Sequence, residues 1–303
     1  MKGRRVDGIL LLDKPQGLSS NEALQEAKRL FGAAKAGHTG SLDPLATGVL
    51  PLCFGEATKF SQFLLNSDKR YRARIQLGVR TDSADADGEV IETRPVPTLT
   101  EAQIDAELAA FRGDIEQVPS MFSAIKHQGK PLYKLARQGI EVEREARPVT
   151  IFENRIEAFD GVNLDLYIHC SKGTYVRTIA DDLGEALACG AHVTALRRTG
   201  VGPFDVDGTF TLERLEAIRG DGGHAALDAL LQPVETSVQH WPEVHLTDLT
   251  AYYLSKGQPV IVPRAPTEGW VRIHEDVADG PSRFLGVGEV LDDGRIAPRR
   301  LVN

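Results

Sequence analysis

The chain has 303 residues, enough to bury a sizeable core and to form one large domain and a smaller one. Of these residues, 42% are hydrophobic and 26% are charged, which is typical of an ordinary soluble globular protein. Its formal net charge of −8 at pH 7 excludes an indiscriminate polyanion binder, because non-specific nucleic-acid affinity comes mostly from Lys and Arg neutralising phosphates. Its apolar runs are too short to span a bilayer and no signal peptide is recognisable, so we expect a cytoplasmic protein without membrane association.

The cysteines and histidines predict neither a disulfide framework nor a metal site. Cys53, Cys170 and Cys189 are an odd set without CxxC spacing. The eight histidines include no HExxH pattern, and His240 and His245, five positions apart, would not share one helical face. We therefore expect reduced, buried cysteines and no metal ion.

A strand and a helix are predicted first, and they lead into a glycine-rich segment. Residues 6–12 are an apolar run closed by the turn sequence KPQG, which is typical of a buried strand. Ser19 and Glu22 form a capping box, and apolar residues then repeat at helical spacing as far as residue 31. We expect this helix to pack on a sheet and to deliver the chain into residues 37–48.

Residues 37–48, GHTGSLDPLATG, place small residues on both sides of a single acid, Asp43. A backbone rich in Gly and Thr can approach a ligand closely, and Pro44 biases Asp43 towards extended or turn conformations. An Asp-Pro pair in such a loop usually only initiates a turn. Composition alone therefore leaves a turn and a presented catalytic carboxylate both open.

The same pattern continues through residues 49–60, VLPLCFGEATKF. The whole stretch resembles the string GHTGxLDPxATGxLPxCxGxATKF of bacterial tRNA pseudouridine synthases of the TruB type, with Ser41 where many relatives carry Ala. The resemblance implies that Asp43 is the catalytic aspartate and that His38 contacts the RNA substrate. As a lone histidine, His38 would otherwise be a loop hydrogen-bonder.

Three elements are predicted after the loop over residues 37–48: a short strand over residues 49–54, a helix over 56–65 and a clean strand over 71–79. In the last of these, apolar residues alternate with basic and polar ones, so one face should be buried. Tyr71 leads the apolar face, where a Tyr usually belongs to the core. The resemblance implies that it stacks on the target base instead.

Two basic groups are candidates for RNA contact, although a solvated surface would have the same composition. One precedes Tyr71. The other lies within residues 119–147, which mix basic and aromatic residues between glycines without a sheet period, a combination that suits a flap ordering on RNA. In the family this insert is the thumb. The candidate RNA-binding residues are Lys69, Arg70, Lys126, Lys130 and Lys134.

Residues 81–88, TDSADADG, are interpreted as an acidic turn and not as a calcium loop. With Gly88 in the sixth position of such a loop, Ser83 and Arg94 would take the first and twelfth positions, where calcium binding needs acids.

A second motif, SKGTYVRTIADDLG, occupies residues 171–184 and should turn from strand to helix at Gly173. Tyr175 and Arg177 would then lie in the first helical turn, beside a sheet end where sites are common. On residue type alone, Arg177 would more often be a surface arginine. The resemblance implies that Tyr175 contacts the substrate and that Arg177 pairs with the catalytic aspartate.

The C-terminal part predicts a small second domain. Residues 232–242 are the expected linker, and the short glycine- and valine-containing stretches after it resemble a β-rich PUA-like RNA-binding module. We predict a pseudouridine synthase catalytic domain over residues 1–240, with the thumb over 119–147, and a PUA-like domain over 243–303. The resemblance also implies that Leu196, on a predicted strand, lines the uridine pocket.

The predicted fold is α+β, with a mixed, mostly antiparallel central sheet flanked by helices. The function implied by the resemblance is isomerisation of uridine to pseudouridine at position 55, in the T-loop of tRNA, on a flipped-out nucleotide. Asp43, Tyr71 and Arg177 would be the catalytic residues. Moving uracil from an N1 to a C5 linkage involves no net redox change, so no cofactor is expected. Covalent attack by Asp43 and abstraction of a sugar proton both stay open.

Two other classes of function also stay open at this point. One is a tRNA-folding chaperone in which catalysis is secondary. The other is a glycosidic hydrolase with an Asp nucleophile, which should carry a second acid as proton donor, and no motif supplies one. The expected partner is the T-arm stem-loop of tRNA. We expect a monomer, because closing on a folded RNA needs no second subunit.

Overall fold

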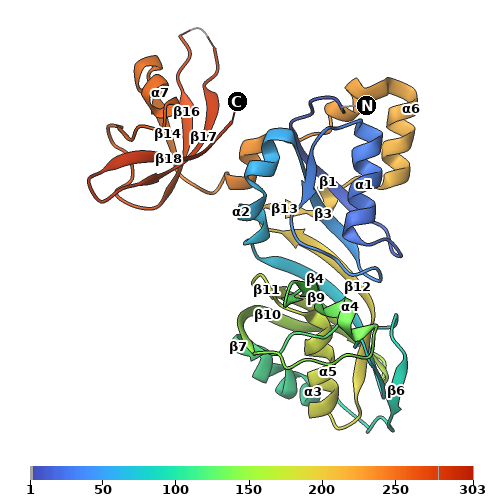
Figure 1. Cartoon of the computed structure of the whole chain (residues 1–303). Coiled ribbons are helices and arrows are strands. Elements are labelled where there is room, and N and C mark those ends of the chain that lie inside the picture. Colours follow the sequence, from blue (N-terminus) through green and yellow to red (C-terminus); the bar gives the residue numbers. More distant parts are fainter. Residues whose placement is uncertain (1–2, 279, 303) are drawn as a thin grey trace.

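The computed structural model describes residues 3–278 and 280–302. Within these residues the chain forms a nine-stranded sheet, a separate five-stranded sheet and two small two-stranded ones. Figure 1 shows the five-stranded sheet, in orange and red, standing to one side of the rest. The strands of the large sheet are β1 (Gly8–Lys14), β2 (Ala36–His38), β3 (Thr47–Phe54), β4 (Lys69–Leu77), β7 (Gly113–Gln117), β10 (Arg147–Phe159), β11 (Asn163–Cys170), β12 (Ala191–Val201) and β13 (Phe204–Asp205).

The large sheet has the order β1-β3-β12-β4-β11-β10-β7, with β2 added to β3 and β13 added to β12. Its described strand pairs are antiparallel except for β3 and β12, which run parallel where Arg198 lies opposite Gly48. Along β4 the residues alternate between buried and more exposed positions, as the sequence predicted. The expected mixed, mostly antiparallel sheet is therefore confirmed.

Helices cover the sheet in two groups, each with its own hydrophobic core. Apolar residues of α1 and α6 pack against β1 and β3, and those of α3 and α5 pack against β4, β10 and β11. The predicted capping box is present, with Ser19 as N-cap and Glu22 as its partner. The bounds are α1 (Ser20–Phe31), α2 (Ser61–Leu65), α3 (Glu101–Leu108), α4 (Leu132–Ala136), α5 (Val176–Ala186), α6 (Leu212–Asp228, with a kink at Gly223), and the 3₁₀ helices η1 (Gly55–Lys59), η2 (Ala109–Phe111) and η3 (Val206–Gly208).

Two of the predicted elements are interrupted. The helix expected over residues 56–65 divides into η1 and α2 at Phe60, whose ring is fully buried and lies against Phe284 of the small sheet. The strand expected over 71–79 ends before Gly78, which has a φ of +89° and no room for a Cβ beside Val96. The chain continues as the two-stranded hairpin β5 (Val79–Thr81) and β6 (Val90–Thr93).

The predicted thumb has its own small structure in front of the large sheet (Figure 1). It contains the hairpin β8 (Lys126–His127) and β9 (Lys130–Pro131), followed by α4. A miniature core of Met121, Leu132 and Leu135 holds it together. The absence of a sheet period in this stretch reflects these very short strands.

The small sheet has the order β14-β16-β17-β18-β15 and confirms the β-rich C-terminal unit. Aromatic contacts join it to α2, where the Phe63 ring lies against Trp241 and Trp270. The limits 1–240 and 243–303 for the two domains stay a prediction. The elements are η4 (Val234–Val238), β14 (Glu243–Leu246), α7 (Asp248–Ser255), β15 (Val260–Ile261), β16 (Trp270–Glu275), β17 (Arg283–Val290) and β18 (Arg295–Leu301). Among the described helices, none combines the length and the apolar character needed to cross a membrane.

Candidate active site

A cleft of about 790 Å³ opens over the large sheet, between the glycine-rich loop, the thumb and the start of α5. It also reaches the beginnings of β4 and β10 and the middle of β12. Six residues singled out in the sequence line this cleft: Asp43, Lys69, Tyr71, Tyr175, Arg177 and Leu196. Residues far apart in the chain therefore converge on one concave site.

Asp43 and Arg177 form the expected ion pair, with Nε of Arg177 2.9 Å from Oδ2 of Asp43. The two side chains differ in exposure: that of Arg177 is 3% exposed and that of Asp43 is 40% exposed. A buried guanidinium therefore faces a carboxylate that solvent, or a substrate, can reach. Such a neighbouring positive charge favours the ionised carboxylate.

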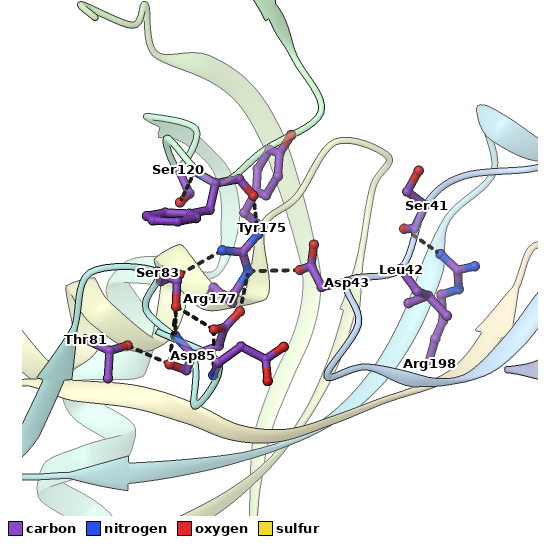
Figure 2. Close-up of polar contacts among 12 residues, drawn as sticks. Ser41, Leu42, Asp43, Thr81, Ser83, Asp85, Ser120, Tyr175, Arg177 and Arg198 are labelled. Atoms are coloured by element: carbon purple, nitrogen blue, oxygen red, sulfur yellow. Dashed lines mark hydrogen bonds and ion pairs between the residues drawn. The ribbon is translucent and has the colours of Figure 1, made fainter. Parts of the chain in front are cut away.

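Three further acceptors surround the Arg177 guanidinium (Figure 2). Nη1 donates to the Ser83 carbonyl at 2.7 Å and Nη2 to the Phe122 carbonyl of the thumb at 2.9 Å. Nε also lies 3.4 Å from Oδ2 of Asp85. The planar fork of an arginine matches this set of acceptors, which a lysine could not reproduce.

Asp85 was not among the residues predicted for the site. It belongs to the acidic turn over residues 81–88, but its side chain is only 6% exposed. Its carboxylate accepts a hydrogen bond from Ser83 Oγ at 2.5 Å, and a backbone bridge to Val193 draws the turn onto β12. Burial raises the pKa of Asp85, while Ser83 and Arg177 oppose that shift. No feature of the sequence distinguished this acid from its solvated neighbours.

The loop that carries Asp43 is held from both ends. Oγ of the buried Ser20, on α1, accepts from the Leu42 backbone N–H at 2.7 Å and donates to the Leu42 carbonyl. Gly48 then passes against Arg198 with a φ of +102°, where a Cβ would lie 2.2 Å from the Arg198 carbonyl oxygen. The glycine after the acid is thus required by close backbone packing.

Buried cations fix the same loop by donating to backbone carbonyls. Arg198, 1% exposed, donates from Nε to Val49 at 2.8 Å and from its two Nη atoms to Ser41 and Gly40. Lys14, also buried, donates from Nζ to the Pro44 carbonyl of the loop at 3.4 Å and to the Leu18 carbonyl at 2.6 Å. Burial lowers the pKa of Lys14 to about 8. Arg198 and Lys14 thus bring two basic side chains close to the loop that carries Asp43.

Tyr71 and Tyr175 complete the walls. The ring of Tyr71 is buried, and burial raises the pKa of its hydroxyl, with the neighbouring Arg198 opposing the shift. Tyr175 is the N-cap residue of α5, one position before the helix proper. Its backbone is clamped by Gln117, whose side-chain amide accepts from the Tyr175 N–H at 2.7 Å and donates to its carbonyl. The Tyr71 ring and the Tyr175 backbone are thus held in place by the protein itself.

The candidate RNA-binding residues do not form one surface. Lys126, Lys130 and Lys134 are exposed on the thumb. Lys69, in contrast, is buried at the cleft and donates to the carbonyls of Leu65 and Ser67, so the interpretation of a solvent-facing basic group is wrong for it.

Arg70 and His38 also differ from the other predicted residues. Arg70 pairs with Asp205 at 2.9 Å and donates to the Phe204 carbonyl. His38 lies on β2 and does not line the cleft as far as the described residues show. Its Nδ1 is buried without a hydrogen-bond partner among them, and burial lowers the pKa of the ring. Contacts of either side chain with RNA stay a prediction.

The burial of Lys69 predicts a specific pH dependence of stability. Burial lowers its pKa from 10.5 to about 8, so between these values the unfolded chain binds a proton that the folded chain does not. The free energy of unfolding should therefore gain up to about 1.4 kcal/mol per pH unit from this group as the pH rises. In denaturant unfolding, the free energy of unfolding of Lys69→Met should not show this increase with pH. The variant Lys126→Met, an exposed control, should show it as the wild type does. Parallel curves for all three proteins would contradict the assignment.

Family models match three successive parts of the chain. They are described as TruB family pseudouridylate synthase (N terminal domain) over residues 28–176, tRNA pseudouridylate synthase B C-terminal domain over 177–239, and pseudouridine synthase II TruB, C-terminal, over 242–302. A tRNA pseudouridine synthase B of Coxiella burnetii is 57% identical over 299 residues, covering 99% of this chain and 96% of the relative. The chain belongs to the TruB family.

Other relatives support the same placement. A tRNA pseudouridine synthase B of Serratia proteamaculans is 58% identical over 308 residues. The match covers 99% of this TruB family chain and 96% of the relative. A chain in a solved Cbf5-Nop10-Gar1 complex is 26% identical, with a TM-score of 0.70 over 94% of this chain and 78% of that one. A chain of an H/ACA RNP bound to a substrate RNA, 24% identical, has a TM-score of 0.73 over 97% and 84%, which shows the shared fold.

The TruB family motifs led to Asp43 and Arg177, but not to every residue that builds the site. Asp85 and Arg198 carry no local signal, because a turn acid and a strand arginine usually face solvent. Arg147 and Lys172 also line the cleft and add positive charge to it. The pairing of β12 with β3 and β4 is what brings Arg198 to the site.

Proposed function

We propose that this TruB family enzyme, a tRNA pseudouridine synthase, isomerises uridine at position 55 in the T-loop of tRNA, with Asp43 as nucleophile. One observation carries the proposal: a reachable carboxylate lies 2.9 Å from a guanidinium that is almost fully buried. The pair is set in a cleft lined by cations and two tyrosines. Nothing in the structure favours a chaperone role or a glycosidic hydrolase over this function.

The chemistry needs a carboxylate that stays ionised in a site closed by RNA. Isomerisation breaks the N1–C1′ bond, turns the uracil and joins C1′ to C5; the C5 proton then leaves and N1 takes up a proton. Asp43 can attack covalently or abstract a sugar proton, and Arg177 supports either route because its charge favours the carboxylate anion. The carbonyls of Ser83 and Phe122 accept from that guanidinium and orient it toward Asp43.

A base stacked in the T-loop must leave its stack before Asp43 can reach its sugar. Extrusion costs a few kcal/mol, and stacking on an aromatic side chain is worth about 1–3 kcal/mol per base. Tyr71 is the proposed stacking partner, with Tyr175 and Leu196 as further walls of the uridine pocket, because all three line the cleft beside Asp43.

Replacing Tyr71 with Phe keeps the ring and removes the hydroxyl. A fall of roughly 10²–10⁴-fold in the single-turnover rate, with a nearly unchanged Kd for tRNA, would implicate the hydroxyl in proton transfer. Rapid-quench measurement of product at saturating enzyme tests this. A rate equal to that of the wild type would reduce Tyr71 to a stacking platform.

The remaining RNA contacts are proposed from exposure and charge. Lys126, Lys130 and Lys134 are exposed on the thumb and are proposed to contact the phosphates of the T-arm. His38 is proposed as a further contact with the substrate, and Lys69 and Arg70 as further contacts with the RNA. We propose a monomer acting in the cytoplasm, with the PUA-like unit as a second RNA-binding surface.

Removal of the chain from Val244 onward tests the last point. It should weaken tRNA binding, by about 10-fold or more, while the rate at saturating enzyme changes much less, because the cleft is built entirely from residues before it. Binding would be measured by filter retention and rate by quench. An unchanged Kd would contradict an RNA-binding function for this unit.

The proposed reaction itself is tested with an unmodified tRNA transcript. After incubation, digestion to nucleosides should yield one new nucleoside with the mass of uridine but a different retention time, from position 55. No free uracil should form. Release of uracil would instead identify a hydrolase, and an unaltered tRNA that has changed only its folding would identify a chaperone.

A further inference from the structure

A group of potential metal ligands lies in the small sheet, apart from the cleft. Strands β14 and β16 run parallel and place His245 directly opposite His274, with Glu243 two residues earlier on the same face. One ligand atom from each of these three residues lies within 4.8 Å of the others. The spacing of His240 and His245 could not reveal this group, because strand pairing and not helical periodicity assembles it.

Each histidine has one ring nitrogen occupied by a carboxylate. Nδ1 of His245 lies 2.7 Å from Oδ1 of Asp276, and Nε2 of His274 lies 2.9 Å from Oε2 of Glu235. Metal-binding histidines usually hold a carboxylate or carbonyl with the nitrogen that does not bind the metal, which sets the tautomer. Both rings are therefore oriented as ligands of this kind would be.

The other ring nitrogen of His274, Nδ1, indicates that a ligand binds at this site. The side chain of His274 is only 7% exposed, and its Nδ1 is buried without a hydrogen-bond partner in the part of the chain that the structure describes. A buried polar atom without a partner carries a free-energy penalty, so such atoms are rare unless something else occupies the site. An ion bound at Nδ1 would remove the penalty.

We propose that Glu243, His245 and His274 bind one divalent transition-metal ion of the Zn²⁺ type. The ligand atoms are Nε2 of His245, Nδ1 of His274 and Oε1 of Glu243. Two imidazoles and a carboxylate are a donor set that suits Zn²⁺, Ni²⁺ or Cu²⁺, and does not suit Mg²⁺ or Ca²⁺.

The surroundings of Glu243 fit this assignment. Its Oε1 already lies 3.6 Å from Nε2 of His245, close to the roughly 3.4 Å between ligand atoms in a tetrahedral zinc site. Arg272 donates to the other oxygen, Oε2, at 3.2 Å and thereby leaves Oε1 for the metal. The Glu243 and His245 side chains are 52% and 42% exposed, so they are free to close around an ion.

An ion at this position would tie β14 to β16. Through His274 and Glu235 it would also tie the small sheet to η4, the segment that joins it to the rest of the chain. The ion would therefore stabilise the C-terminal unit, and its three ligands lie outside the lining of the cleft around Asp43.

The test is a titration of the tag-free, metal-stripped full chain with Zn²⁺, read by calorimetry against a competing chelator. We expect one equivalent to bind with micromolar or tighter affinity. His245→Asn and Glu243→Gln, both at exposed positions that should not disturb folding, should weaken binding by about 10–100-fold. His240→Asn, an exposed histidine outside the group, is the matched control and should bind like the wild type.

A second readout identifies the atoms. In histidine-selective ¹⁵N spectra, Zn²⁺ should shift Nε2 of His245 and Nδ1 of His274, and should raise the melting temperature of the wild type but not of His245→Asn. The proposal is overturned if no saturable binding occurs, if both ligand variants bind as tightly as the wild type, or if the shifted nitrogens belong to other histidines.

Discussion

Replacing Asp43 with Asn is expected to lower the single-turnover rate of pseudouridine formation by about 10⁴-fold or more, equivalent to roughly 5.5 kcal/mol of activation free energy. The amide has the shape of the carboxylate and its oxygen can still accept from Nε of Arg177, so the cleft should keep its geometry. The amide can neither attack C1′ nor take up a proton from the sugar. Only the chemistry is removed.

The measurement separates chemistry from binding and folding. Rates come from rapid quench at saturating enzyme, Kd for tRNA from filter retention, and stability from denaturant unfolding. Kd and stability should stay close to those of the wild type. Asp207→Asn, an exposed acid outside the cleft, serves as the matched control and should keep the full rate. Turnover retained by Asp43→Asn would refute its assignment as the nucleophile.

The second large effect is expected for Arg177→Met, which removes the guanidinium and leaves the Asp85 carboxylate buried without its cation. Breaking a buried ion pair in this way typically lowers stability by 3–5 kcal/mol, and the rate should fall almost to background because Asp43 loses its neighbouring charge. Denaturant unfolding and rapid quench report the two losses separately.

A double variant distinguishes the two functions of Arg177. In Arg177→Met, the further change Asp85→Asn removes the unpaired buried charge and should recover a large part of the lost stability. It should recover none of the activity, because Asp43 remains without its guanidinium. A double variant that is no more stable than Arg177→Met would show that Asp85 is not the acid left uncompensated.

Local patterns predicted the parts of the fold that depend on local physics. The alternation along β4 and the capping box at Ser19 both reappear in the structure, because burial on one face and satisfied helix N–H groups act over a few residues. Two predicted elements are interrupted, at Phe60 and at Gly78, by contacts with residues distant in the sequence. The Phe60 ring packs against Phe284 of the small sheet, and Gly78 lies so close to Val96 that a Cβ would not fit.

The site shows the same division. Asp43 and Arg177 stand in long motifs, so the resemblance to known enzymes placed them correctly as a pair. The local sequence suggested that Asp85 and Lys69 face solvent, but both are buried. The turn carrying Asp85 packs against β12, and Lys69 lies at the cleft, where it donates to backbone carbonyls. Burial of a charged group is decided by tertiary packing, which composition does not reveal. For His274 the pairing of distant strands is the missing information.

We propose that Asp43, held beside a buried Arg177, moves the uracil of position 55 from N1 to C5. A tRNA transcript carrying tritium at C5 of that uridine tests it most directly, because forming the new carbon–carbon bond releases the C5 hydrogen. Under single-turnover conditions the wild type should release one tritium per tRNA without free uracil, and Asp43→Asn should release almost none. Undiminished release by Asp43→Asn, or product formed at another uridine while position 55 keeps its label, would contradict the account.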